Sequence, residues 1–380
     1  MVDNANSQDV LDYGENVGYD DAAMGWATLQ YSLDEVASAG DVLVDKKCSA
    51  DDYDRALDVV NNWRSCHAFA LNTLQMNLRR KASAMDVNAT IAQRIKRLPA
   101  IIHKLDRLRW LRLSKIQDIG GCRGILSNVR QVNKLRDEFV NGSGMQHILI
   151  TQDDYITNPK KTGYRGIHLV YEYRSKRNSL HNGRKIEIQL RSRLQHAWAT
   201  AVETVGLFSQ QYLKSNRGDT RWLRFFSLMG SAMAQREKVS PVPGTPTDTT
   251  ELISELTTLA SELEVRTKLA AWTSALQWVR PQQEGSHFLL SLDTRAERLT
   301  VTTYGKSQLE QANADYLKLE KDNTGKPGRD AVLVTLESVK SLRTAYPNYF
   351  ADTRLFMEAV DAATKNLLTK GNPRQLSLPI

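Results

Sequence analysis

The chain has 380 residues, of which 41% are hydrophobic and 25% charged, and its formal net charge is +8. This length is enough to bury a sizeable core and predicts two domains. No stretch approaches the ~20 apolar residues of a membrane span. The acidic N-terminus lacks the basic-then-apolar pattern of a signal peptide, so we expect a cytoplasmic protein that does not bind a membrane.

The three cysteines, Cys48, Cys66 and Cys122, form no CxxC pair. They are too few for a zinc site, so we expect neither a disulfide framework nor a structural metal.

The net charge conceals an asymmetry along the chain. Residues 1–60 hold 14 acidic and 3 basic side chains, whereas residues 79–136 hold 15 basic and 3 acidic ones. Such a basic block creates a positive field suited to a polyphosphate or a nucleic acid. By itself it is also typical of solvated helix faces.

In the N-terminal half, periodic apolar residues after Asp51 and Asp52 predict a helix that continues to about Lys81. A second helix is predicted from near Val87, with a bend at Pro99. The further predicted elements are a strand over 116–126, a helix over 129–140, strands over 147–151, 167–173 and 185–190, and a helix over 194–208. Together they predict an α+β domain, a mixed β-sheet flanked by helices, that ends near residue 238.

The segment 240–249 is the one tract dense in Pro, Gly and Thr, and it predicts a linker. We therefore divide the chain into a domain over 1–238, a linker over 239–250 and a C-terminal domain over 251–380. The second unit is predicted as a smaller α+β domain. Its expected elements are a helix over 250–279, strands over 287–292 and 298–303, a helix over 307–319, a strand over 330–336 and helices on both sides of 346–349.

Polar and apolar residues alternate between Glu187 and Arg191. A period of two places Glu187, Gln189 and Arg191 on one face of a strand. A carboxylate, an amide and a guanidinium would then point into one cleft. The segment taken alone also fits an ordinary amphipathic edge strand.

Basic residues upstream suggest a phosphate site. If the second predicted helix continues through them, Arg94, Arg97 and Lys104 lie on one stripe that can present several cations, with Lys96, to a triphosphate. Asp118 stands before a strand that holds Arg123. A carboxylate in so basic a neighbourhood favours Mg²⁺ between it and the phosphates, although a capping role is the alternative.

The loop 159–168 joins basic charge, a glycine and an aromatic face. Binding of a phosphorylated base requires this combination. In order and spacing, the segments 94–105, 118–123, 159–168 and 187–191, with His196, resemble the synthetase domain of RelA/SpoT homologues. The resemblance covers about residues 50–230. It implies a nucleotidyltransferase-like fold and an enzyme that uses Mg²⁺ to transfer the β,γ-pyrophosphate of ATP to a ribose 3′-hydroxyl.

The resemblance also implies a role for each matching residue. Asp118 and Glu187 correspond to the Mg²⁺ carboxylates, and Glu187 also draws the proton from the attacking hydroxyl, with Gln189 beside it. The ATP-binding set is Arg94, Lys96, Lys104 and Arg123. The acceptor-binding set is Tyr164, which stacks on the base, with Lys160, His168, Arg191 and His196.

Two positions depart from the family pattern. Arg97-Leu98-Pro99-Ala100 stands where Ser-Pro-Glu-Ser is usual, and Thr162 stands where alarmone synthetases usually have Asn. The second departure leaves guanine recognition in question.

The C-terminal half resembles the antitoxin-like domain, a zinc-finger look-alike without zinc ligands, of CapRel-type fused toxin–antitoxin proteins. The residues that carry this resemblance are 288–293, 332–334 and above all 346–350. It implies that Tyr346 and Tyr349 plug the ATP site, that the domain recognises a phage structural (capsid) protein, and that the enzyme pyrophosphorylates the 3′ CCA end of tRNA. Tyr346 and Tyr349 could equally be core aromatics, although the X-Pro bond at Pro347 favours an exposed turn.

We expect tRNA as the acceptor because the cations exceed what one ATP needs: Arg79, Arg80, Lys81, Arg107, Arg109 and Arg112 remain. Three alternatives stay open at this point. They are a (p)ppGpp synthetase that uses GDP or GTP, a catalytically inactive nucleotide sensor, and a nucleotidyltransferase that transfers AMP.

Overall fold

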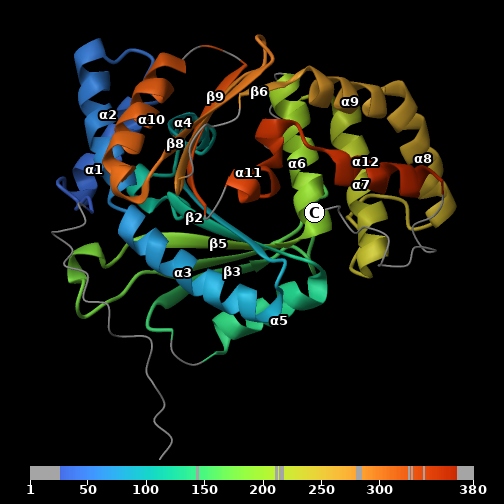
Figure 1. Cartoon of the computed structure of the whole chain (residues 1–380), viewed down its shortest axis with the longest axis horizontal. Coiled ribbons are helices and arrows are strands. Elements are labelled where there is room, and N and C mark those ends of the chain that lie inside the picture. The colour runs from blue at the N-terminus through green and yellow to red at the C-terminus, as the bar shows by residue number, and fades with distance from the viewer. Residues whose placement is uncertain are drawn as a thin grey trace, which may run out of the picture.

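A computed structural model describes residues 26–142, 145–209, 213, 218–279, 285–323, 326, 328–336 and 339–365. Within these residues one nine-stranded sheet runs through the molecule in the order β3-β4-β5-β2-β1-β9-β7-β8-β6, with helices around it (Figure 1). None of the helices among them has both the length and the apolar character needed to cross a bilayer. The fold is therefore of the predicted α+β class.

The strands are β1 Thr90–Ile95, β2 Gly120–Leu126, β3 Ile148–Asp154, β4 Ile167–Glu172, β5 Lys185–Ser192, β6 Gln277–Val279, β7 His287–Asp293, β8 Arg298–Tyr304 and β9 Arg329–Thr335. The α-helices are α1 Leu33–Val42, α2 Ala50–Ser65, α3 Ala68–Met85, α4 Leu98–Arg107, α5 Val129–Val140, α6 Arg193–Phe208, α7 Thr220–Glu237, α8 Thr249–Glu262, α9 Val265–Ala275, α10 Leu309–Asn323, α11 Val339–Ala345 and α12 Arg354–Thr364. Short 3₁₀ turns include η1 Leu113–Lys115, η2 Ser179–His181 and η5 Pro347–Phe350.

One face of the N-terminal part of the sheet is apolar. Ile186, Ile188 and Leu190 of β5 are fully buried there in a cluster with α3 and α5 residues, and both helices lie under this face in Figure 1. β2 and β5 pair in parallel, whereas β1, β4 and β3 run antiparallel to their neighbours in this part of the sheet. The opposite face of the same strands is left for polar residues, since side chains alternate along a strand.

The C-terminal strands extend this same sheet. β9 pairs with β1 through Gln93 opposite Thr335 and Arg94 opposite Val334, and β7, β8 and β6 follow. Residues 251–365 thus do not stand apart from the predicted synthetase half. The predicted linker lies between α7 and α8, and α8 begins at Thr249.

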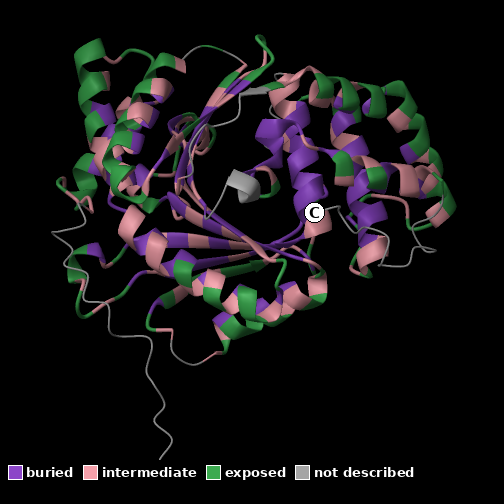
Figure 2. Cartoon of the chain, in the orientation of Figure 1, coloured by how far each residue is buried: buried purple, intermediate pink, exposed green. Residues whose placement is uncertain are grey.

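A second core is helical. α6, α7, α8, α9 and α12 gather on one side of the sheet (Figure 1), and the interior of α6 and α7 is largely buried (Figure 2). Ser192 begins α6 with a capping box, in which its hydroxyl accepts a hydrogen bond from the Gln195 backbone N–H. This start directly after β5 fixes α6 close to the polar face of the sheet.

The second helix predicted from near Val87 is wrong. Residues 90–95 form β1, which is held between β2 and β9, and strand pairing here overrides local helical preference. Pro99 does not bend a helix but lies in the first turn of α4, where its missing N–H costs no hydrogen bond. The predicted stripe of Arg94, Arg97 and Lys104 on one helix therefore does not exist.

Two other predicted helices are divided. The chain turns at Cys66 and His67 between α2 and α3, so that α2 packs with α1 and α4 while α3 packs under the sheet. The helix predicted over 250–279 consists of α8, α9 and the strand β6. The predicted helix over 129–140 and the strands over 287–292 and 298–303 are confirmed closely.

Candidate functional site

Glu187, Gln189 and Arg191 lie on one face of β5, as the alternation of polar and apolar residues predicts. Gln189 Nε2 donates to Glu187 Oε2 at 2.6 Å, and an Arg191 NH2 donates to Gln189 Oε1 at 3.1 Å. His168 on β4 stands directly opposite Gln189 in the antiparallel register. Four polar side chains from two strands thus share one surface.

A chain of close contacts joins Glu187 to Tyr164. His168 Nδ1 lies 2.7 Å from Glu187 Oε1, and the Tyr164 hydroxyl lies 2.5 Å from His168 Nε2. Burial alone would lower the pKa of His168, but Tyr164 and the hydrogen bond to Glu187 raise it to about 9. Burial would likewise raise the pKa of Glu187, but the contact with His168 lowers it to about 2. Glu187 is therefore an anion beside a cationic imidazole.

Asp118 lies between two lysines that come from different elements. Lys96, which follows β1, places Nζ 2.5 Å from one carboxylate oxygen, and Lys104 of α4 places Nζ 2.9 Å from the other. Burial raises the pKa of Asp118, but the two ammonium groups lower it further, so the net shift is downward. The sequence predicts that Lys96 and Lys104 bind one triphosphate, and the structure brings them together although they share no helix.

The negative charges of Asp118 and Glu187 repel one another. Besides burial, the charge of Asp118 opposes the lowering of the Glu187 pKa by His168. Carboxylate oxygens are hard ligands of the kind that Mg²⁺ takes. These two residues would hold the ion.

Arg94 of β1, Arg123 of β2, and Arg191 of β5 form a cluster of guanidinium groups with His196 of α6. Burial, then Arg191 and Arg94, lower the pKa of Arg123 to about 10. Burial, then the charges of Arg123 and Arg191, lower the pKa of His196 far below its usual value. Three buried nitrogens of this cluster have no hydrogen-bond partner among the described residues: Arg123 Nε, Arg191 Nε and His196 Nδ1. The two arginine Nε–H groups are buried donors without acceptors and fit an anionic ligand, whereas Nδ1 of the neutral His196 is an acceptor because Nε2 faces the Thr344 carbonyl.

The loop before β4 places Tyr164 over this surface. An Arg191 NH2 donates to the Tyr164 hydroxyl at 2.9 Å, and Lys160 Nζ lies 5.5 Å from the centre of the Tyr164 ring and 4.1 Å from that of Tyr155. Gly163 precedes it with φ +95°, and a Cβ there would lie 2.7 Å from Phe226 O. A side chain at position 163 would therefore clash with the α7 backbone and shift the loop that carries Tyr164.

The C-terminal part of the chain reaches this site through Tyr346. Its hydroxyl donates to the Gln93 carbonyl of β1 at 3.1 Å, and its ring centre lies 6.0 Å from the Arg123 guanidinium carbon. Arg123 also donates to the Ala345 carbonyl at 3.4 Å, and His196 Nε2 lies 3.3 Å from the Thr344 carbonyl. The segment 344–346 therefore contacts Arg123, which is predicted to bind ATP, and His196, which is predicted to bind the acceptor.

Tyr346 and Tyr349 are not in an exposed turn as the sequence predicted. Both are buried, at 4% and 1% exposure, in a cluster that joins C-terminal residues to Ala92 of β1. The 3₁₀ turn η5 holds Tyr349, whose hydroxyl accepts from Arg97 at 3.0 Å and donates to Asp330 at 3.0 Å. Pairing of β9 with β1 is what brings the turn inward.

A second set of contacts joins the N-terminal and C-terminal halves of the chain, and the sequence did not predict it. Glu320 of α10 accepts a hydrogen bond from the backbone N–H of Leu98 at 2.9 Å and forms an ion pair with Arg64 at 2.8 Å. Asp330 of β9 pairs with Arg97. The N-terminus of α4 is thus capped by a carboxylate from the C-terminal half, at a place that favours anions.

One sequence signal could have revealed Glu320. Ala312, Tyr316 and Glu320 recur every four residues, so the carboxylate falls on the buried stripe of α10. A buried charge requires a partner. Arg64, next to Trp63 on the apolar face of α2, is its counterpart, but sequence alone does not pair them.

The six basic residues that the sequence predicts to bind tRNA lie in two separate parts of the structure. Arg79, Arg80 and Lys81 belong to α3, under the apolar face of the sheet and away from Glu187. Arg107 ends α4, and Arg109 and Arg112 lie in the segment that follows it. Only this second group follows directly on the helix that carries Lys104.

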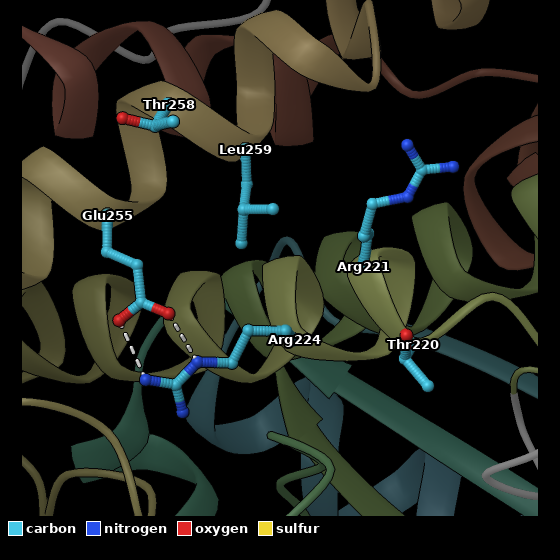
Figure 3. Close-up of a pocket in the computed structure, with 6 residues that line it drawn as sticks. All are labelled: Thr220, Arg221, Arg224, Glu255, Thr258 and Leu259. Atoms are coloured by element: carbon cyan, nitrogen blue, oxygen red, sulfur yellow. Dashed lines mark hydrogen bonds and ion pairs between the residues drawn. The ribbon is translucent and has the colours of Figure 1, made fainter.

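An open depression lies between α7 and α8 and is lined by Thr220, Arg221, Arg224, Glu255, Thr258 and Leu259 (Figure 3). No residue of the predicted site lines it. Glu255 accepts two hydrogen bonds from Arg224, at 2.6 and 2.7 Å. Arg224 and Glu255 at its wall therefore neutralise each other.

The fold and this surface define a class of protein in which one face of a mixed sheet carries two carboxylates and a cluster of cations. Residues 93–210 match the model described as the region found in RelA / SpoT proteins. This segment, less than half of the chain, is therefore similar to the region found in RelA / SpoT proteins. It contains Arg94, Asp118, Glu187 and His196.

Solved structures to which the chain is similar include small alarmone synthetase 1 from Bacillus subtilis bound to pppGpp, with 26% identity over 29% of this chain and 58% of that one (TM-score 0.26). The chain thus spans less than two thirds of that protein. A GTP pyrophosphokinase family protein from Streptococcus pneumoniae is 20% identical over 50% of this chain and 91% of its own (TM-score 0.38). Small alarmone synthetase 2 from Bacillus subtilis is 22% identical over 46% and 93% (TM-score 0.39). No curated protein matches the chain.

Proposed function

We propose that the protein is an ATP-dependent pyrophosphokinase of the RelA/SpoT type that transfers pyrophosphate to the 3′-hydroxyl of the tRNA CCA end and is held inactive by its own C-terminal half. The observation that carries the proposal is the convergence of Lys96 and Lys104 on Asp118, in the field of Glu187 and beside buried donors that lack acceptors. A nucleotide polyphosphate supplies the acceptors that these donors lack.

In the proposed reaction, the acceptor 3′-oxygen attacks the β-phosphorus of ATP. A new O–Pβ bond forms, the bond between the α,β-bridging oxygen and Pβ breaks, and AMP leaves. The hydroxyl proton passes to Glu187, and Mg²⁺, held by Asp118 and Glu187, would neutralise charge on the phosphates. Lys96 and Lys104 exchange Asp118 for phosphate oxygens, and Arg123 and Arg191 hold the remaining negative charge.

Autoinhibition is part of the proposal because Tyr346 occupies the cationic cluster. Its ring lies against Arg123, and the 344–346 segment accepts one hydrogen bond from Arg123 and contacts His196. Glu320 and Asp330 neutralise Arg64, Arg97 and the N-terminus of α4. An intramolecular inhibitor acts at an effective concentration of about millimolar, so modest affinity is enough to exclude ATP. Binding of a phage structural protein by the C-terminal half would release it.

The second candidate is a (p)ppGpp synthetase, which the names of the similar structures favour. Thr162 in the acceptor loop and the arginines after α4 favour tRNA instead. Full-length protein and a variant with Tyr346→Ala and Tyr349→Ala would be incubated with γ-labelled or α-labelled ATP and either tRNA or GDP. We expect γ label on tRNA with the variant. Label on GDP alone supports the second candidate, and α label on the acceptor contradicts both.

A further inference from the structure

Trp110 stands out among the exposed side chains. It is 79% exposed, in the segment between α4 and η1, and it is flanked by Arg109 and, two residues on, by Arg112. An indole left in water forgoes a large hydrophobic gain. The chain here does not lack apolar neighbours, because Leu111 packs against the α1–α2 core and Leu113 is fully buried. Trp110 is therefore presented outward on an anchored segment.

The surroundings of Trp110 are cationic. Arg107 and Arg112 are exposed, and their guanidinium groups have no hydrogen bond or ion pair within the part of the chain that the structure describes. Arg109 is paired with Asp106. An aromatic face between two uncommitted guanidinium groups suits a ligand that has both a flat apolar surface and negative charges.

This segment begins at the edge of the site. Lys104 in the last turn of α4 contacts Asp118 at 2.9 Å, and Arg107 follows three residues later, within one helical turn. Residues 107–112 thus begin within one helical turn of the lysine that contacts Asp118.

We infer that residues 107–112 bind an unpaired stretch of RNA beside its reacting 3′ end, with a base stacked on Trp110 and phosphates on Arg107 and Arg112. The inference rests on the proposed function, since it names how that site holds its acceptor. Unpaired bases stack on aromatic side chains irrespective of sequence, and arginines follow the backbone. A bilayer is a poorer match because the apolar residues of α4, Leu98, Ile101 and Leu105, are already buried.

The test uses the full chain, in which this segment is exposed without any activation. Binding of a fluorescent single-stranded RNA ending in CCA, and of a blunt RNA duplex, is measured at several salt concentrations. Trp110→Ala should weaken binding of the single strand by about 5- to 100-fold and leave duplex binding unchanged, while Trp110→Phe should stay near wild type. The matched control Leu180→Ala removes another exposed apolar side chain, 69% exposed, and should change nothing.

The contribution of Arg107 and Arg112 is measured separately, by the salt dependence of RNA binding. Replacing Arg107 and Arg112 by Gln should reduce the slope of log Kd against log salt by about 1.4, since each phosphate contact contributes about 0.7 on a single strand. Arg295→Gln, an exposed arginine in the turn between β7 and β8, is the control.

Equal RNA binding by Trp110→Ala and wild type would overturn the inference. If Trp110→Ala keeps its RNA binding but loses binding to phosphatidylserine vesicles, the segment binds a lipid surface instead of RNA. If γ label passes to GDP and not to tRNA, the acceptor in the proposed function is wrong. The binding assay still decides separately whether residues 107–112 hold RNA.

Discussion

Arg64 and Glu320 form an ion pair of 2.8 Å in which both side chains are nearly inaccessible, at 3% and 4% exposure. Arg64 belongs to α2 and Glu320 to α10, so the pair joins the two halves of the chain. The same carboxylate accepts hydrogen bonds from Tyr316 and from the first turn of α4. Removing one member of a buried pair leaves the other charge without compensation, which costs about 3 to 5 kcal/mol.

Glu320→Gln should therefore weaken the contact between the halves and raise ATP affinity. The neutral amide leaves Arg64 buried and unpaired, and opening would return it to water. ATP binding is measured by calorimetry, and opening by hydrogen exchange at α10 and β9. Lys321→Gln is the control, because its ion pair with Asp54 is exposed and such pairs contribute little. The same gain in ATP affinity from Lys321→Gln would contradict this role for Glu320.

Tyr346→Phe tests the plug with less risk to folding than alanine. The ring still packs in its cluster, and only the hydrogen bond to the Gln93 carbonyl is lost. We expect a loss of about 1 kcal/mol from the closed arrangement and a corresponding increase of about 5-fold in ATP affinity or basal transfer, measured with γ-labelled ATP.

The double change Tyr346→Ala and Tyr349→Ala should give constitutive transfer and toxicity in cells. Toxicity should disappear when Glu187→Gln is added. A double-alanine protein that is folded by circular dichroism and yet harmless would leave both tyrosines as core residues without an inhibitory role.

Glu187→Gln should abolish transfer and nearly preserve ATP binding. The change keeps the size of the side chain but removes the charge needed for Mg²⁺ and for proton abstraction, and loss of a base typically lowers the rate ~10² to 10⁴-fold. The rate is measured on the opened Tyr346→Ala, Tyr349→Ala protein. Glu262→Gln, which changes an exposed carboxylate at the end of α8, away from the proposed site, is compared with it. Substantial transfer by Glu187→Gln would rule out its catalytic role.

His168 should make stability depend on pH. Its pKa is raised to about 9 by Tyr164 and Glu187 despite burial, so the folded protein binds more protons there than the unfolded chain above about pH 6.5. This contribution to the free energy of unfolding is complete below about pH 6.5 and falls as the pH rises. The pKa of Tyr164 is lowered to about 8, which opposes the fall above pH 8.

Urea unfolding at pH 6.5, 7.2 and 8 checks this prediction. The difference in unfolding free energy between wild type and His168→Gln should shrink across this range. A difference that stays constant would mean that the pKa of His168 is not raised in the folded protein. His67 and His196 have lowered pKa values and titrate on the acid side, and they are common to both proteins.

The sequence alone determined the surface on which chemistry is proposed. A period of two placed Glu187, Gln189 and Arg191 on one face of a strand, and their hydrogen bonds confirm it. The helix α5 could be predicted for a similar reason, since local periodicity and the Asn128 cap describe it without reference to the rest of the fold. Such features depend on neighbours in sequence.

Only the tertiary structure decided how the two halves meet. Residues 90–95 became a strand because β2 and β9 pair with them, and this brought Lys96 and Lys104 to Asp118 from separate elements. The same pairing buried Tyr346 against Arg123, and it placed Glu320 at the start of α4. Contacts between residues far apart in the chain depend on register and burial, and one sequence contains the charges but not their partners.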